Sequence, residues 1–188
     1  MKKLCLLAVS VIIGVTALHA QYGIDIGAKG GVNFASVDGD DTDGLDGRTS
    51  IHIGGVVNIS ISELFAVQPE LLYSRQGFEN NDANVTVFLD YLNIPLLADF
   101  TVADGLSLQG GPQIGFKLNS IVKDNDTDNE VDLEDVEGVD LGVGIGGQYN
   151  LPMGLFFQAR YVVGISDVFE NFNGKNNVLS LSVGYFFK

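Results

Sequence analysis

The last twelve residues of the chain, 177–188, read NVLSLSVGYFFK, and this stretch decides the fold. Apolar residues stand at every second position from Leu179 to Phe187 and alternate with two serines, a glycine and Phe186. Side chains of a strand point to opposite faces with a period of two, so one face is apolar or aromatic and the other is mostly small or polar. A strand that ends on aromatic residues predicts the closing strand of a transmembrane β-barrel, with Tyr185 and Phe187 at the lipid interface.

The N-terminus has the features of an export signal. Two lysines and a long apolar run precede Ala20, a small residue suited to cleavage before Gln21. We therefore predict a signal peptide over residues 1–20 and one mature domain over residues 21–188. Cleavage also removes Cys5, the single cysteine of the chain, so a disulfide framework is not expected.

The composition favours an acidic all-β protein. Of 188 residues, 46% are hydrophobic and 24 are glycine, and the apolar residues occur in short periodic runs. Without the two lysines of the signal, 8 basic residues stand against 24 acidic ones. This net charge disfavours nucleic acid and anionic surfaces as partners. No second segment has the run of about 18 apolar residues that a transmembrane helix needs.

Eight segments of the mature chain alternate as the last one does. Most are long enough for a tilted strand to cross a bilayer, which takes about 9–11 residues. An even number of strands suits an antiparallel barrel whose two ends lie on one side of the membrane. The predicted strands cover residues 24–36, 49–61, 65–78, 86–100, 106–117, 139–149, 155–166 and 177–188.

The joins between these strands alternate strictly between short and long. The short joins are residues 62–64, 101–105 and 150–154, and the long joins are residues 37–48, 79–85, 118–138 and 167–176. Outer-membrane barrels have this pattern, with short periplasmic turns and long extracellular loops. A soluble lipocalin-type barrel is the alternative, but its apolar side chains point into a ligand cavity. The second face here carries charges, so we predict an all-β, eight-stranded antiparallel up-and-down transmembrane β-barrel behind a cleaved signal peptide.

The charges on the second face predict a polar lumen. Eight strands enclose a space that side chains fill, and a buried charge without a partner is costly. We predict an interior network around Arg160 and Glu70, to which Asp99 or Asp140 contributes, with Lys29 at a similar depth. Such a network would plug the lumen and fix the register of the strands. A conduction path is the alternative interpretation.

Acidic residues are concentrated in the long joins. The segment DNDTDNEVDLED resembles an EF-hand calcium loop, although Asn129 stands where that motif has glycine and its last acid is an aspartate. A solvated acidic loop without metal is the simpler interpretation, and Ca²⁺ is the alternative cofactor hypothesis. The carboxylates that would form this site are Asp124, Asp126, Asp128, Glu130, Asp132 and Asp135.

The mature chain has one histidine, His52, near the outer end of the second predicted strand. A barrel hydrolase would need a histidine with a nearby serine and an orienting acid. Ser50 and Ser74 are neighbours in the predicted barrel, but nothing in their spacing demands catalysis. We therefore do not expect an enzyme.

Four segments carry a resemblance to a known family. They are GAKGGVNFA (27–35), YLNIPLLADF (91–100), GPQIGF (111–116) and ARYVVGISDV (159–168). In this order the mature chain resembles the small outer-membrane β-barrel domain family, often called porin-family or PorT-like proteins. The resemblance implies an eight-stranded barrel in the outer membrane of a diderm bacterium, with no established catalytic residues. It also implies that Tyr185 and Phe187 are recognised by the barrel-assembly machinery, although Lys188 departs from the usual terminal phenylalanine.

Three functional classes follow. The first is a structural or interaction barrel that displays acidic extracellular loops and tethers a protein partner through them. The second is a narrow porin-like channel, and the third is an accessory component of a protein secretion system. In each case we expect a monomer surrounded by outer-membrane lipid.

Overall fold

The computed structural model of this chain describes residues 23–39, 42, 44–133, 135–169 and 173–187. The predicted signal peptide lies outside them. Within these ranges, no helix is long and apolar enough to cross a membrane. The strands are β1 (Gly23–Asp38), β2 (Leu45–Ser60), β3 (Phe65–Asn80), β4 (Val85–Ala103), β5 (Leu106–Asp124), β6 (Glu130–Asp132), β7 (Val139–Asn150), β8 (Leu155–Gly164) and β9 (Lys175–Phe187).

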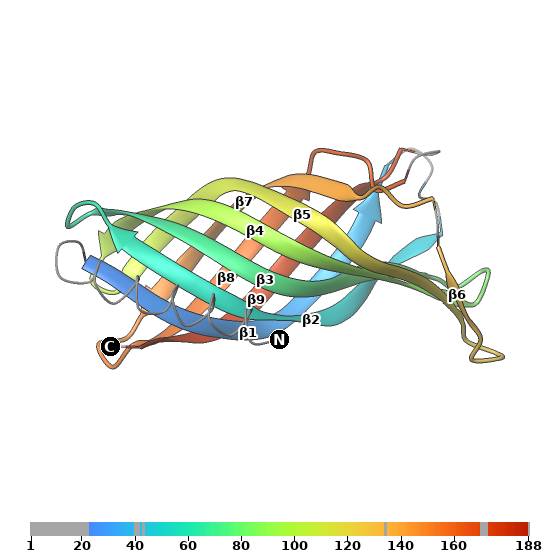
Figure 1. Cartoon of the computed structure of the whole chain (residues 1–188), viewed down its shortest axis with the longest axis horizontal. Helices are drawn as coiled ribbons and strands as arrows, with labels where there is room; N and C mark the ends of the chain where they lie inside the picture. Colours follow the sequence, from blue (N-terminus) through green and yellow to red (C-terminus); the bar gives the residue numbers. More distant parts are fainter. Residues whose placement is uncertain (1–22, 40–41, 43, 134, 170–172, 188) are drawn as a thin grey trace, which may run out of the picture.

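The eight long strands close into a barrel, which confirms the predicted fold class. Each pairs antiparallel with the next long strand, and the β4–β5 and β1–β9 pairings complete the ring. In the closing pair, Ala28 stands opposite Tyr185 and Ala35 opposite Val178. The barrel wall therefore has no free sheet edge. Figure 1 shows the short turns and the C-terminal end of β9 at one end of the barrel and the longer connections at the other.

The strands extend further into the extracellular joins than the sequence predicted. β2 begins at Leu45, inside the join expected over residues 37–48, and β5 continues to Asp124. Within the join expected over residues 118–138, β6 pairs with the end of β5, and the two form a projection beyond the barrel (Figure 1). Acidic and glycine-rich composition lowers strand propensity, but a neighbouring strand already in register offers paired backbone groups that outweigh it.

The two faces of the wall have opposite chemistry. Outward side chains such as Ile53, Leu108 and Ile145 are 61%, 55% and 69% exposed in the isolated chain, as expected for residues that contact lipid. The inward face is polar, with buried glutamines, serines and asparagines from every side of the ring. The alternation predicted from the sequence thus separates lipid from lumen.

Clusters of apolar side chains occupy the two ends of the lumen in the described part of the chain, while single ones such as Leu72 and Val162 lie among the polar groups between them. Near the periplasmic end, Val56, Phe156 and Phe186 form a small cluster, in which the two phenylalanine rings lie 4.6 Å apart. Gly184 makes room for it, because a Cβ there would lie 2.2 Å from the Phe156 ring. A larger cluster closes the extracellular end, and its buried members are Val37, Phe78, Val87, Leu89, Tyr91, Val136, Val168 and Phe169.

Candidate functional site

An ion-paired layer crosses the lumen between β1, β3 and β8. Arg160 donates two hydrogen bonds to the carboxylate of Glu70, from Nη1 to Oε2 at 2.8 Å and from Nη2 to Oε1 at 2.6 Å. Lys29 Nζ lies 2.8 Å from Glu70 Oε2. All three side chains are almost fully buried, so the paired geometry offsets the cost of removing charge from water. The structure brings these three of the predicted lumen residues together.

Buried glutamines extend this layer toward the periplasm. Lys29 donates to Gln158 Oε1 at 2.6 Å, and Gln158 donates in turn to Gln109 Oε1 at 2.7 Å. Gln109 then donates to Asp99 Oδ2 at 2.5 Å. Asp99 therefore joins the network through two amides and not by a direct ion pair. These glutamines were not singled out from the sequence, although their inward positions follow from the strand period.

Asp140 belongs to a different polar layer nearer the outside. It accepts hydrogen bonds from Ser166 at 3.3 Å and from Asn176 at 3.2 Å. Asn176 also donates to Gln76, and Gln76 donates to Ser74. The sequence analysis offered Asp99 or Asp140 as a contributor to one network, and the structure joins Asp99 to it and separates Asp140.

His52 lies in this outer layer between an amide and a hydroxyl. Its Nδ1 is 2.8 Å from Asn33 Oδ1, and its Nε2 is 2.8 Å from Ser182 Oγ. The amide oxygen can only accept, so Nδ1 carries the proton and Nε2 accepts from Ser182. The neighbours considered from sequence are occupied elsewhere: Ser50 donates to the Arg75 carbonyl, and Ser74 accepts from Asn33. The arrangement has an amide where a catalytic triad has an acid.

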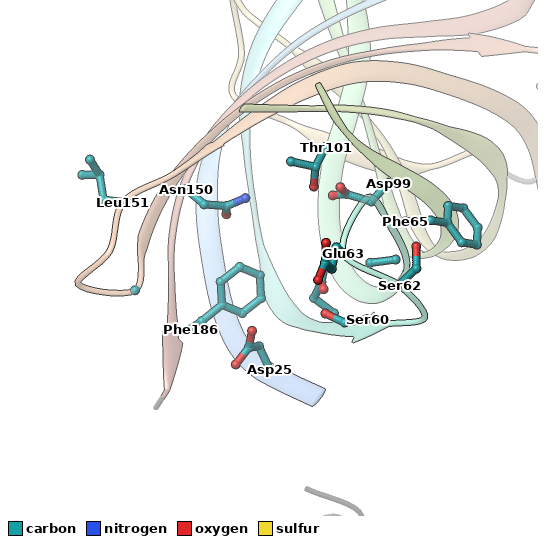
Figure 2. Close-up of a pocket in the computed structure, with 13 residues that line it drawn as sticks. Asp25, Ser60, Ser62, Glu63, Phe65, Asp99, Thr101, Asn150, Leu151 and Phe186 are labelled. Carbon is teal, nitrogen blue, oxygen red and sulfur yellow. The ribbon is translucent and has the colours of Figure 1, made fainter. Parts of the chain in front are cut away.

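The periplasmic mouth is a polar vestibule of about 210 Å³. Figure 2 shows the carboxylates of Asp99, Glu63 and Asp25 around it, with Phe65 and Phe186 at its sides. Further inside, the lumen has a cavity of about 20 Å³ between the two polar layers. That volume holds roughly one water molecule.

The extracellular end is covered by loop residues. Val136 precedes β7, and Val168 and Phe169 follow β8; all three are buried against inward residues of β3 and β4. Phe78 and Phe169 meet edge to face with ring centroids 6.0 Å apart. Backbone bonds hold this cover in place, since the Glu137 amide donates to the Val168 carbonyl at 2.9 Å.

The acidic residues proposed for calcium do not converge. Glu130 and Asp132 lie in β6, while Asp128 pairs with Lys123 at 2.7 Å. Asp124 accepts the backbone amides of Asp126 and Thr127, which closes a turn and lowers the pKa of its exposed carboxyl. No group of three potential metal ligands stands together among the described residues. The segment from β5 to β6 has the form of a hairpin, and the calcium hypothesis stays a prediction.

The closing strand places its aromatic residues on the outer wall near the periplasmic end. Tyr185 stands opposite Leu155 of β8, and its ring lies 5.9 Å from that of Phe187. Both rings are exposed in the isolated chain. This is the position of a periplasmic aromatic girdle.

A cationic group that the sequence analysis missed lies on the outer wall near the extracellular end. The guanidinium groups of Arg48 and Arg75 lie over the same Phe88 ring, at 4.0 and 5.5 Å from its centroid. Arg75 is bound by Asp90 at 2.8 and 3.1 Å. Arg48 donates to the Gln76 carbonyl at 3.3 Å, and no carboxylate of the described residues pairs with it.

Sequence comparison assigns the chain to a family. The model of the outer membrane protein beta-barrel domain matches residues 19–170, so the protein belongs to this family and resides in the cell outer membrane. The narrower PorT-like name stays a prediction. No curated protein is similar enough to match.

Solved structures of small outer-membrane barrels share the fold. Ail, the attachment invasion locus protein of Yersinia pestis, is 18% identical, with 87% of this chain and 98% of Ail covered and a TM-score of 0.58. Neisserial surface protein A is 17% identical, with 88% of this chain and 97% of that one covered and a TM-score of 0.60. At these identities the likeness concerns the fold alone.

Proposed function

We propose that this outer-membrane barrel does not conduct solutes and acts through the extracellular segments that it displays. The observation that carries the proposal is the occupation of the lumen by buried, mutually bonded side chains, above all the Glu70–Arg160 pair. The apolar cluster at the outer end adds a second obstruction. A hydrated solute would have to break both.

Single-channel recording in planar bilayers tests the closed lumen. We expect no reproducible conductance from the purified protein, while a porin added to the same bilayer gives clear steps. Steady conductance steps from the wild-type barrel would favour the narrow-channel alternative, for which the periplasmic vestibule would be the inner mouth.

The projection formed by β5 and β6 is the extracellular segment that we propose to bind a partner. It carries Asp126, Asp128, Glu130 and Asp132 in exposed positions. Charge complementarity favours a positively charged partner and opposes polyanions. Ail has been crystallised with the heparin analogue sucrose octasulfate, which is a polyanion. The two barrels are thus expected to differ in their ligands.

Binding of polylysine to the barrel in nanodiscs probes this surface. We expect binding that weakens steeply with salt, because exposed charges are screened over about 10 Å at 0.1 M salt. The variant D126N/D128N/E130Q/D132N should bind several-fold less tightly. A control variant, D25N, changes an acid at the periplasmic mouth and should leave the affinity unchanged. Equal binding by wild type and the four-site variant would contradict the proposal.

Insertion into the membrane is proposed to depend on the closing strand through the barrel-assembly machinery. Deletion of residues 185–188 removes Tyr185 and Phe187 and the bonds that β9 makes to the first residues of β1. We expect the deletion to abolish insertion, measured by fractionation of outer membranes. Wild-type levels of the truncated protein in that fraction would contradict the role of these residues.

A further inference from the structure

The outer wall changes character at one level near its extracellular end. On β1 the outward side chains are apolar up to Phe34 and are then Ser36 and Asp38. On β3 the outward residue Tyr73 is followed, two positions later, by Arg75. Tyrosine and arginine at such a boundary are typical of the membrane–water interface. Since the termini and short turns mark the periplasmic side, this level is that of the outer-leaflet headgroups.

At this level Arg48 provides a positive charge that no carboxylate of the described residues binds as a direct ion pair, although Glu79 and Asp90 lie near enough to attract it. Its guanidinium is held by the Phe88 ring and by one backbone carbonyl, while Asp90 is occupied by Arg75. Of the three arginines, all of them in the described part of the chain, Arg75 and Arg160 each have a carboxylate partner. A guanidinium stacked on a ring keeps its planar fork of donors free at the edge, which suits a phosphate.

A groove of about 290 Å³ lies beside Arg48 between β1 and β2. Its lining changes from apolar at Phe34 to hydroxyl-bearing at Thr49 and Ser36. Phe34 and Thr49 stand opposite one another across the two strands, so the change coincides with the boundary of the apolar wall. Gly47 borders the groove without a side chain that would fill it.

We propose that this groove binds the phosphorylated headgroup of an outer-leaflet lipid, with Arg48 contacting the phosphate and Phe34 contacting the start of an acyl chain. A lipid fits the site better than a free anion, because Phe34 in the lining is 43% exposed and continues the apolar outer wall that faces the hydrocarbon region. The net negative charge of the protein does not oppose this assignment, since headgroup binding depends on the local cation at the interface. The inference is independent of the proposed extracellular partner.

Native mass spectrometry of the detergent-purified protein tests the site. The protein is titrated with phosphatidic acid and with diacylglycerol of the same acyl chains, which differ only in the phosphate. We expect wild type to retain phosphatidic acid at least five-fold more than R48Q does, with diacylglycerol retained equally by both. R48K, which keeps the charge and loses the fork, should lie between them. Equal retention of phosphatidic acid by wild type and R48Q would overturn the proposal.

Two controls separate the proposal from simpler explanations. Lys123 is a cation of the exposed β5–β6 projection that pairs with Asp128, so K123Q should retain phosphatidic acid as wild type does. Inorganic phosphate in excess should not displace the lipid, and displacement would reassign the groove to free anions. The heat-sensitive, folded electrophoretic species of R48Q and R48K is compared with that of wild type to show that both variants fold. A partial loss of lipid in folded R48K, beside the larger loss in R48Q, supports recognition by the guanidinium fork.

Discussion

In the middle of the lumen, Glu70 binds Arg160 and Lys29 in a layer of charges and amides. At the outer end of the same lumen, Leu89, Val136 and Phe169 pack as in the interior of a soluble protein. The difference follows from what surrounds each level. Within the membrane the outer wall faces lipid, so apolar side chains gain little from pointing inward, and those that do, such as Leu72 and Val162, lie singly among polar groups. Above it the strands and loops meet water, and the hydrophobic effect again drives apolar side chains inside.

One barrel interior thus combines a polar packing at the level of the membrane with an apolar packing above it. The ion-paired layer is built by strands alone, because inward positions of β1, β3 and β8 meet across the ring. The apolar cover needs loop residues such as Val168, which close over the strands from outside. The following substitutions test how far the two interiors depend on these different forces.

The largest effect is expected from E70Q. Removing this carboxylate leaves Lys29 and Arg160 buried without a counter-charge, which typically costs about 3–5 kcal/mol of unfolding free energy. Urea unfolding in lipid vesicles, followed by far-UV circular dichroism, measures it. E79Q, at the outer end of the same strand, should change stability by less than about 0.5 kcal/mol. A loss below about 1 kcal/mol in E70Q would show that the charged layer is dispensable.

L89A tests the apolar cover. Leu89 is fully buried, so its truncation should cost about 2–5 kcal/mol in the same unfolding measurement. L96A on the same strand is the matched control, since Leu96 is 50% exposed and faces lipid. Equal losses in the two variants would contradict a water-driven apolar core at the outer end.

G184A tests the small cluster near the periplasm. An added Cβ would meet both the Phe156 ring at 2.2 Å and the Ala28 carbonyl at 2.8 Å, so we expect a loss of about 1–3 kcal/mol. G55A is the control, because a Cβ there meets nothing nearer than the Gly27 carbonyl at 3.9 Å. A neutral G184A would mean that the wall can move away from Phe156.

The smallest effect is expected at the exposed tip, where neither interior contributes. Backbone amides of Thr127 and Asp126 lower the pKa of Asp124 in the folded protein. Because the pKa is depressed in the folded protein, the ionised carboxylate stabilises the turn at every pH above the unfolded pKa of about 3.9. This contribution is lost as pH falls through the folded pKa. The turn should therefore protect these two amides from hydrogen exchange near pH 5, and this protection should be lost in acid. The free energy of global unfolding should not change with it. Unchanged relative protection in D124N would contradict the turn.

Much of the site was predictable because its residues lie on strands, where every second side chain points into the lumen. Arg160 and Glu70 were predicted as inward partners, and they meet. The glutamines followed the same period but carry no charge, so nothing in the sequence marked them as the bridge to Asp99. Arg48 escaped notice because its stacking on Phe88 joins β2 to β4 across an intervening strand.

The sequence by itself determined the closed barrel, its even strand number and its polar lumen, because alternation and join length are local properties. The stretch 177–188 carried this information most clearly. The tertiary structure decided the contacts that link the inward groups, such as that of Lys29 with Gln158, since the two residues are 129 residues apart in the chain. It also decided that β6 forms and that loop residues close the outer end. The cover depends on surfaces that exist only once the ring of strands has closed, whereas β6 depends on its pairing with the neighbouring β5.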